Sequence, residues 1–332
     1  PDNSNLIEAK IKKPDYTLTE IRTDYKKGEL ASLRKAYGRA LVKLGEGNEN
    51  VLVLDGDVNN STYSKYFFER FPERSIQCHI GEQNMAGMAT GLRTRGFTVF
   101  ASTFAAFLTR AHDQIRMAAY SGADINFAGS HTGVSIGQDG PSQMGLEDIA
   151  MFRSIFGSMV LSPADAVAAE KLTRQGALHP GITYMRTIRP PLPVIYDNDE
   201  EFPAGGCKVL VESGEDRVVV IATGITVHEA LEAAVRLAAD NIGIKVIDCY
   251  SIKPIDEKTI IEAAVKTGKV LTVEDHYVEG GLGEAVAAVV AGKAQVKIIG
   301  IKEQPHSGSK EALLRAHGID GNGISDSVRS ML

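Results

Sequence analysis

Short apolar runs alternate with helical stretches along most of the chain, and this alternation constrains the fold more than any other feature. The apolar runs predict strands at 50–54, 75–80, 97–101, 125–128, 158–161 and 182–185. The spacing of apolar residues predicts an amphipathic helix from Glu29 to Leu44, and further helices over 62–71, 83–95, 105–119 and 165–175. Strands separated by helices join in parallel, so we expect a doubly wound sheet with helices on both faces.

The chain divides into two such units. Its 332 residues exceed one ordinary core, and Pro190, Pro191, Pro193 and Pro203 with the acidic run 197–201 have linker composition. Apolar runs at 217–222, 244–249 and 269–273 then alternate with helical stretches at 227–239, 256–267 and 283–290. We therefore expect an α/β fold with two doubly wound domains. The predicted divisions are an N-terminal arm (1–26), a parallel-sheet domain (27–190), a linker (191–206) and a smaller α/β domain (207–332).

Charge and composition exclude several classes of function. The formal net charge of −6 gives no electrostatic footprint for nucleic acid. No apolar run approaches the ~18 residues of a membrane span, and the N-terminus lacks the basic and apolar regions of a signal peptide. Cys78, Cys207 and Cys249 are widely spaced, which predicts neither disulfides nor a zinc cluster. We expect no nucleic acid, no membrane, no metal bound by this chain, and a cytoplasmic location.

Polar and ionisable side chains follow five predicted strands of the first domain. In an open parallel sheet, ligands bind outside the carboxyl ends of the strands. These ends carry Asp55 with Ser61, then Glu82, Phe104, His131, and finally Arg186 with Arg189. A functional site is therefore expected at this edge.

Glu82 is the strongest candidate in this group. It lies between a predicted strand and a helix of small residues, Ala86, Gly87 and Ala89, that leaves little room for solvent. A carboxylate in that place needs a specific partner. Alternatively, Glu82 is an acid at a helix N-terminus, stabilised by the macrodipole by about 0.3 to 1 kcal/mol.

Two further groups allow a structural or a functional interpretation. Phe104 and Phe107 share one helix face, and they form either core or a slot for a flat heterocycle with Arg110 at its edge. His131 starts a long aperiodic loop, and such loops are often functional, although a buried histidine with satisfied hydrogen bonds is the alternative. In the same loop, Asp139 with the Gly-Pro that follows it is also a turn pattern.

Arginine side chains with a hydroxyl suit a phosphate monoester. Arg34, Ser61, His131 and Arg189 belong to elements whose ends could converge, whereas an ordinary surface ion pair is the alternative for each arginine. In the second domain, 274–277 with the glycines of 280–283 favours a packing or interface role over a ligand site, because a short glycine motif is weak evidence of binding.

As a set, these segments resemble transketolase in the form found in animals. The resemblance runs from about Leu33 to near the end of the chain and covers the pyrimidine-binding and C-terminal domains. The segments that carry it are Leu33–Gly38, Leu54–Asp57, Asn60–Thr62, Gly81–Met85, Ser102–Phe107, Asp113–Met117, Gly129–His131, Asp139–Met144 and Val273–Tyr277.

The resemblance implies roles for individual residues. Glu82 matches the glutamate that hydrogen-bonds N1′ of the thiamine diphosphate aminopyrimidine, and it is the expected catalytic residue. Phe104 and Phe107 match the aromatic wall around that ring, and Arg110 stands where other members carry tyrosine.

The implied substrate is a sugar phosphate. Arg34, Ser61, His131 and Arg189 match the group that holds it. Asp139 matches the aspartate that contacts a substrate hydroxyl, and Gln143 stands where the yeast-like and bacterial branch has histidine.

One family motif does not occur in this sequence. The family marks its diphosphate and metal site by Gly-Asp-Gly and a distant Asn, and no such segment is present. The chain therefore looks like the C-terminal subunit of a split transketolase. It would transfer a two-carbon ketol unit from a ketose phosphate to an aldose phosphate only with an N-terminal subunit that binds the diphosphate and Mg²⁺ or Ca²⁺. An α2β2 assembly, with self-association through the pyrimidine domain, is implied.

Three alternatives stay open. Two are enzyme subunits of the same architecture, resembling a deoxyxylulose phosphate synthase or the beta subunit of a 2-oxoacid dehydrogenase. His131 and the loop 139–144 favour the sugar-phosphate branch. The third is a non-catalytic assembly subunit, which has no need to keep Glu82, Phe104 and Phe107 together with that loop.

Overall fold

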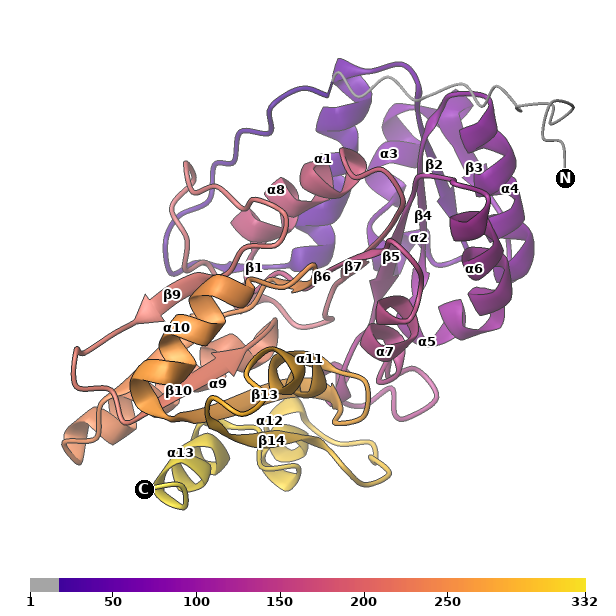
Figure 1. The fold of residues 1–332 in the computed structure, drawn as a ribbon. Helices are drawn as coiled ribbons and strands as arrows, with labels where there is room; N and C mark the ends of the chain where they lie inside the picture. The colour runs from indigo at the N-terminus through magenta and orange to yellow at the C-terminus, as the bar shows by residue number, and fades with distance from the viewer. Residues whose placement is uncertain (1–17) are drawn as a thin grey trace, which may run out of the picture.

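The computed structural model of the chain describes residues 18–332, which form two α/β units side by side (Figure 1). Residues 1–17 of the predicted N-terminal arm lie outside the described residues, and residues 18–26 form neither helix nor strand. Both sheets are largely parallel, so the predicted fold class, two α/β units built on parallel sheets, is confirmed.

The first unit is built on a seven-stranded sheet. In sheet order, its strands are β12 (Ser251–Lys253), β6 (Met159–Leu161), β7 (Ile182–Arg186), β5 (Ile125–Ser130), β4 (Thr98–Phe104), β2 (Val51–Asp55) and β3 (Ser75–Gln77). All neighbours are parallel except β12 and β6. Every residue of the central strands β2, β4, β5 and β7 is buried, which explains their apolar runs.

Helices cover both faces of this sheet (Figure 1). On one face lie α1 (Leu33–Gly47) and α8 (Ala166–Ala177), and on the other α4 (Glu82–Thr94) and α6 (His112–Tyr120). The remaining helices of this unit are the short α2 (Asn59–Thr62), α3 (Lys65–Arg70), α5 (Ala105–Leu108) and α7 (Asp148–Arg153). The helix predicted over 62–71 is interrupted at Tyr63, whose backbone is left-handed at φ 62°.

The second unit has a five-stranded sheet. Its order is β14 (Gln295–Ile301), β13 (Lys269–Tyr277), β10 (Val218–Ala222), β11 (Ile244–Asp248) and β9 (Lys208–Val211), with only β9 antiparallel. Its helices are α9 (Ile225–Ala239), α10 (Glu257–Thr267), α11 (Leu282–Val289), α12 (Lys310–Ala316) and α13 (Gly321–Arg329).

The two units are tied together by more than a linker. Strand β12 comes from the second unit but completes the sheet of the first. The segment predicted as a linker packs closely, since β8 (Leu192–Pro193) pairs with β1 (Leu30–Ala31) and Tyr196 and Phe202 are buried. The domain boundaries drawn from composition stay predictions.

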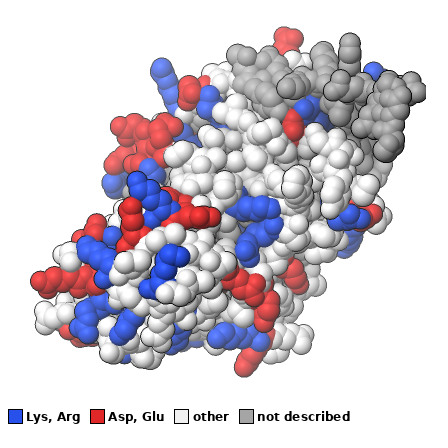
Figure 2. Space-filling model, viewed as in Figure 1, with Lys and Arg blue, Asp and Glu red and all other residues white. Residues whose placement is uncertain are grey.

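The face drawn in Figure 2 is not dominated by charge of one sign. Acidic and basic side chains are interspersed there over both units. Within residues 18–332, no helix is long and apolar enough to cross a membrane.

Candidate functional site

A polar cavity of about 510 Å³ lies at the carboxyl ends of the first sheet. Its lining brings together all six residues predicted to contact the substrate, and one of the predicted aromatic pair. They are Arg34, Ser61, His131, Asp139, Gln143 and Arg189, with Phe104. Residues that are far apart in the sequence therefore meet in one cavity, as expected where parallel strands end at the same edge of a sheet.

Arg34 connects three sides of this cavity. It is the second residue of α1, and its guanidinium donates to the main-chain oxygen of Ser61 at 2.7 Å and of Arg189 at 2.9 Å. Burial lowers the pKa of Arg34, and the charge of Arg189 adds to this effect. The buried Nε–H of Arg34 has no hydrogen-bond partner within residues 18–332, so this donor is unsatisfied by the protein.

Arg189 and Asp139 form an ion pair in the lining of the cavity. The Nε of Arg189 lies 3.6 Å from a carboxylate oxygen of Asp139, and its Nη1 donates to the main-chain oxygen of Ile136 at 3.1 Å. Both side chains are partly exposed, so they are accessible to a ligand. Two guanidinium groups, a hydroxyl and a carboxylate can together bind a phosphate and a nearby hydroxyl.

His131 is buried at the base of the cavity. Its backbone is left-handed at φ 59°, and its Nδ1 lies 3.0 Å from the hydroxyl of Ser130. Burial, and then the charges of Arg34 and Arg189, lower the pKa of His131 to about 3. The imidazole is therefore neutral near pH 7 and can hydrogen-bond a ligand without adding a third cation.

An aromatic stack joins the cavity to Glu82. The ring of Phe104 stacks on His131 at 3.8 Å on one side and on Phe107 at 5.1 Å on the other. The guanidinium carbon of Arg110 lies 4.6 Å from the centre of the Phe107 ring, and its Nη1 donates to Glu82 Oε1 at 2.7 Å. The sequence predicts Arg110 at the edge of a slot for a flat heterocycle, and in the structure its guanidinium lies over the face of Phe107.

Glu82 begins α4 directly after the loop that follows edge strand β3. Its side chain is 2% exposed, while the side chain of Arg110 is 50% exposed. Arg110 contacts both the Glu82 carboxylate and the face of Phe107, so these two groups lie close together. A buried carboxylate can hydrogen-bond a flat, basic heterocycle, and an aromatic face can stack on it. Glu82, Phe107 and Phe104 thus fit the pyrimidine ring that the sequence implied.

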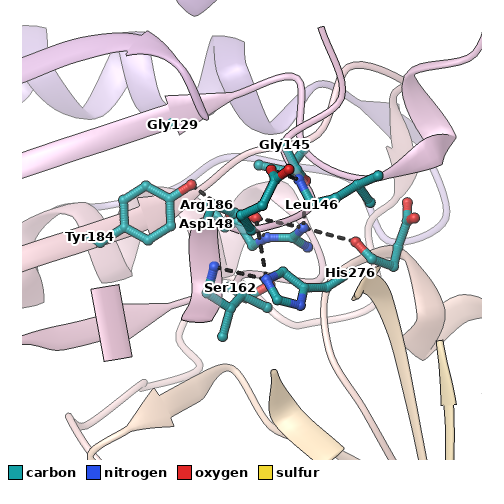
Figure 3. Close-up of polar contacts among 12 residues, drawn as sticks. Gly129, Gly145, Leu146, Asp148, Ser162, Tyr184, Arg186 and His276 are labelled. Carbon is teal, nitrogen blue, oxygen red and sulfur yellow. Dashed lines mark hydrogen bonds and ion pairs between the residues drawn. The ribbon is translucent and has the colours of Figure 1, made fainter. Parts of the chain in front are cut away.

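A buried polar network behind the cavity was not predicted. Figure 3 shows Tyr184, Arg186 and His276 converging on Asp148. Arg186 contacts both carboxylate oxygens of Asp148, at 2.6 and 3.1 Å, and Tyr184 donates at 2.7 Å. Burial alone would raise the pKa of Asp148, but the charges of Arg186 and His276 and the hydrogen bonds from Arg186 and Tyr184 together lower it. The sequence did place Arg186 at a strand end, but no pattern marked Asp148 as its partner.

Glu274 has a structural role at the start of α11. Its carboxylate accepts the main-chain N–H groups of Leu282 at 2.6 Å and Gly283 at 2.8 Å, and burial raises its pKa to about 8. These contacts agree with the packing role expected for 274–277.

Within residues 18–332, no cluster of three or more His, Cys, Asp or Glu side chains could hold a metal ion.

Two family models match the chain. The transketolase pyrimidine-binding domain matches residues 30–194, and the transketolase C-terminal domain matches residues 207–324. The chain belongs to the transketolase family. The resemblance inferred from the sequence segments is confirmed.

Relatives and solved structures agree with this assignment. Transketolases of Rattus norvegicus and Homo sapiens are each 50% identical over 327 residues, which cover 96% of this chain and 52% of the relative. The chain therefore spans about half the length of these transketolases. A split-gene transketolase, described as an inactive beta4 tetramer, superposes with a TM-score of 0.83 at 37% identity, over 90% of this chain and 98% of that one. The transketolase of Campylobacter jejuni shares the fold, with a TM-score of 0.84 at 22% identity, over 96% of this chain and 49% of that one.

Proposed function

We propose that this chain is the C-terminal subunit of a split transketolase. With an N-terminal subunit, it transfers a two-carbon ketol unit from a ketose phosphate to an aldose phosphate. The observation that carries the proposal is one continuous arrangement, in which the aromatic stack joins buried Glu82 to the polar cavity of Arg34 and Arg189. The match to nearly the full length of a split-gene transketolase chain supports it.

Glu82, Phe104 and Phe107 are proposed to hold the pyrimidine ring of thiamine diphosphate. When bound, this cofactor supplies the carbon nucleophile of the reaction. Glu82 would share a proton with N1′ of the ring from its buried carboxylate. Phe107 would cover one face of the ring, and Arg110 would leave that face, since its half-exposed side chain has solvent to move into.

The polar cavity is proposed to bind the sugar phosphate. Arg34, Ser61 and Arg189 would hold the phosphate group, with neutral His131 as a hydrogen-bonding partner. Asp139 and Gln143 line the same cavity and would contact sugar hydroxyls.

The diphosphate and its Mg²⁺ or Ca²⁺ ion are assigned to the N-terminal subunit. The split-gene relative is described as an inactive beta4 tetramer, which agrees with a need for a second kind of subunit. Two copies of each subunit, in contact through the pyrimidine domain, are proposed.

Thermal unfolding of the mixed subunits tests this division. A ligand that binds only the assembled site raises the Tm of the assembly and not of the separate chains. We expect thiamine diphosphate with Mg²⁺ to raise the Tm of the mixture by several degrees and to leave this chain alone unchanged. An equal rise for the chain alone would contradict the shared site.

A further inference from the structure

A carboxylate of the second unit contacts the loop that follows His131, which lines the proposed substrate cavity. Asp275, on β13, accepts the main-chain N–H of Val134 at 2.7 Å and of Ser135 at 3.1 Å, one on each carboxylate oxygen. The aspartate is buried, and the two amides are about 140 residues away in sequence. Both amides belong to a 3₁₀ turn, Val134–Ile136, that begins three residues after His131.

This turn connects the residues that form the substrate cavity. Its last residue, Ile136, accepts a hydrogen bond from Arg189, and the loop starts at His131. Ser135 and Ile136 also line an adjoining cavity of about 410 Å³ together with Arg34 and Arg189. A shift of the turn would therefore move one of the guanidinium groups relative to the imidazole.

The base of the loop is closed and is held by the same network. Gly133 N donates to Gly145 O at 2.8 Å, and Gly145 N donates to His131 O at 3.0 Å. Arg186 then donates to Gly145 O at 3.2 Å and to the main-chain oxygen of Asp275 at 2.8 Å. Figure 3 shows Arg186 between Gly145, Asp148 and His276.

The loop leaves space for a carboxylate. Gly133 has a left-handed backbone at φ 79°, and a Cβ at this position would overlap the carboxylate of Asp275. Two buried N–H groups need two acceptor atoms, and an ionised carboxylate supplies both. An asparagine of the same shape keeps one acceptor and places an N–H₂ group against the second amide.

We propose that Asp275 is a positioning residue for the sugar-phosphate site. Through it, the C-terminal domain fixes the turn Val134–Ile136, and so fixes Arg189 and His131 relative to each other. The effect of Asp275 on substrate binding rests on the proposed function. The clamp, meaning the two hydrogen bonds from Val134 and Ser135 to the Asp275 carboxylate, is a property of this chain.

The test compares Asp275→Asn with Asp216→Asn. Asp216 is a nearly buried carboxylate of the same unit that accepts a main-chain N–H and a hydroxyl from Ser213, in a turn before β10. In Asp275→Asn mixed with the N-terminal subunit, we expect KM for the ketose phosphate to rise about 10-fold and kcat to stay within about 2-fold. The matched control should leave KM unchanged.

Hydrogen exchange of the chain alone supplies a second readout. We expect the amides of Val134 and Ser135 to exchange about 10-fold faster in Asp275→Asn than in wild type, and no change in Asp216→Asn. Gly133→Ala places a Cβ against the Asp275 carboxylate and so disturbs the same contact from the first unit. It serves as the second variant if Asp275→Asn does not fold, and we expect the same rise in KM. Unchanged exchange at both amides, or faster exchange with an unchanged KM, would overturn the proposal. If the wild-type mixture transfers no ketol unit, the proposed function fails, and the exchange measurement alone decides on the clamp.

Discussion

The guanidinium of Arg110 forms a 2.7 Å salt bridge with Glu82 while it lies over the face of Phe107. The carboxylate is buried and the guanidinium is half exposed. Arg110 thus compensates the buried charge of Glu82 in the chain described here. The same two groups, a carboxylate and an aromatic face, are those proposed to receive the cofactor ring.

Arg110→Met should destabilise the chain because it leaves a buried carboxylate without its cation. Loss of one partner of a buried pair costs several kcal/mol, and exposure of Arg110 reduces this to about 1–2 kcal/mol. Urea unfolding measures the change. Arg116→Met is the matched control, since Arg116 pairs with Asp113 and lies over Tyr120 on the surface, and it should cost under about 0.5 kcal/mol. Equal losses in both variants would contradict the role given to Arg110.

Glu82→Gln should lower kcat for ketol transfer by about 100-fold or more in the mixed subunits, because the glutamine cannot share a proton with the ring nitrogen. Circular dichroism should show an unchanged fold. Glu284→Gln is the control, since Glu284 is an exposed acid in the first turn of α11 and has only the helix-terminus role. A Glu82→Gln enzyme with normal turnover would remove Glu82 from the chemistry.

Arg34→Lys should raise KM for the sugar phosphate about 10-fold, because a lysine cannot donate in a fork to Ser61 and Arg189 while it binds phosphate. Steady-state kinetics with the ketose phosphate measures this effect. Arg39→Lys, on the exposed side of the same helix, should leave KM unchanged. The cavity assignment fails if the two variants behave alike.

His131 should stay neutral well below pH 6. Its pKa falls from about 6.5 in the unfolded chain to about 3 in the folded chain, because the ring is buried and faces two arginines. The unfolded state therefore binds the proton first, so this group destabilises the fold as the pH falls below about 6.5, by about 1 kcal/mol between pH 7.5 and 5.5. In NMR titrations, the His131 ring signal should not shift between pH 8 and 5 in the folded chain and should titrate near 6.5 in urea. A folded-state midpoint near 6.5 would contradict the burial and charge described here.

Much of the fold was predictable because central parallel strands are buried on both faces and appear as continuous apolar runs. Some of the elements that were missed have weak patterns, whereas α12 and α13 lie beyond the last helix that was predicted. Strand β14 was not predicted because only its last three residues are buried, and β12 is three residues long and belongs to the sheet of the other unit. Helix α7 was hidden inside the long segment after His131.

The cavity residues were predictable for a similar reason, since parallel topology brings strand ends to one edge. The contacts between units were not, because no local pattern links Asp275 to the turn at Val134 or Arg186 to Asp148. Arg110 and Glu82 are 28 residues apart, and their pairing depends on the torsion angles of the two side chains. The spacing of residues along the chain does not specify these angles.

Ketol transfer by purified subunits tests the central claim most directly. This chain is mixed with an N-terminal subunit, thiamine diphosphate and Mg²⁺, and the transfer from xylulose 5-phosphate to ribose 5-phosphate is measured. We predict transfer in the complete mixture and none with either subunit alone. No transfer in the complete mixture, or full activity of this chain without a partner, would contradict the account.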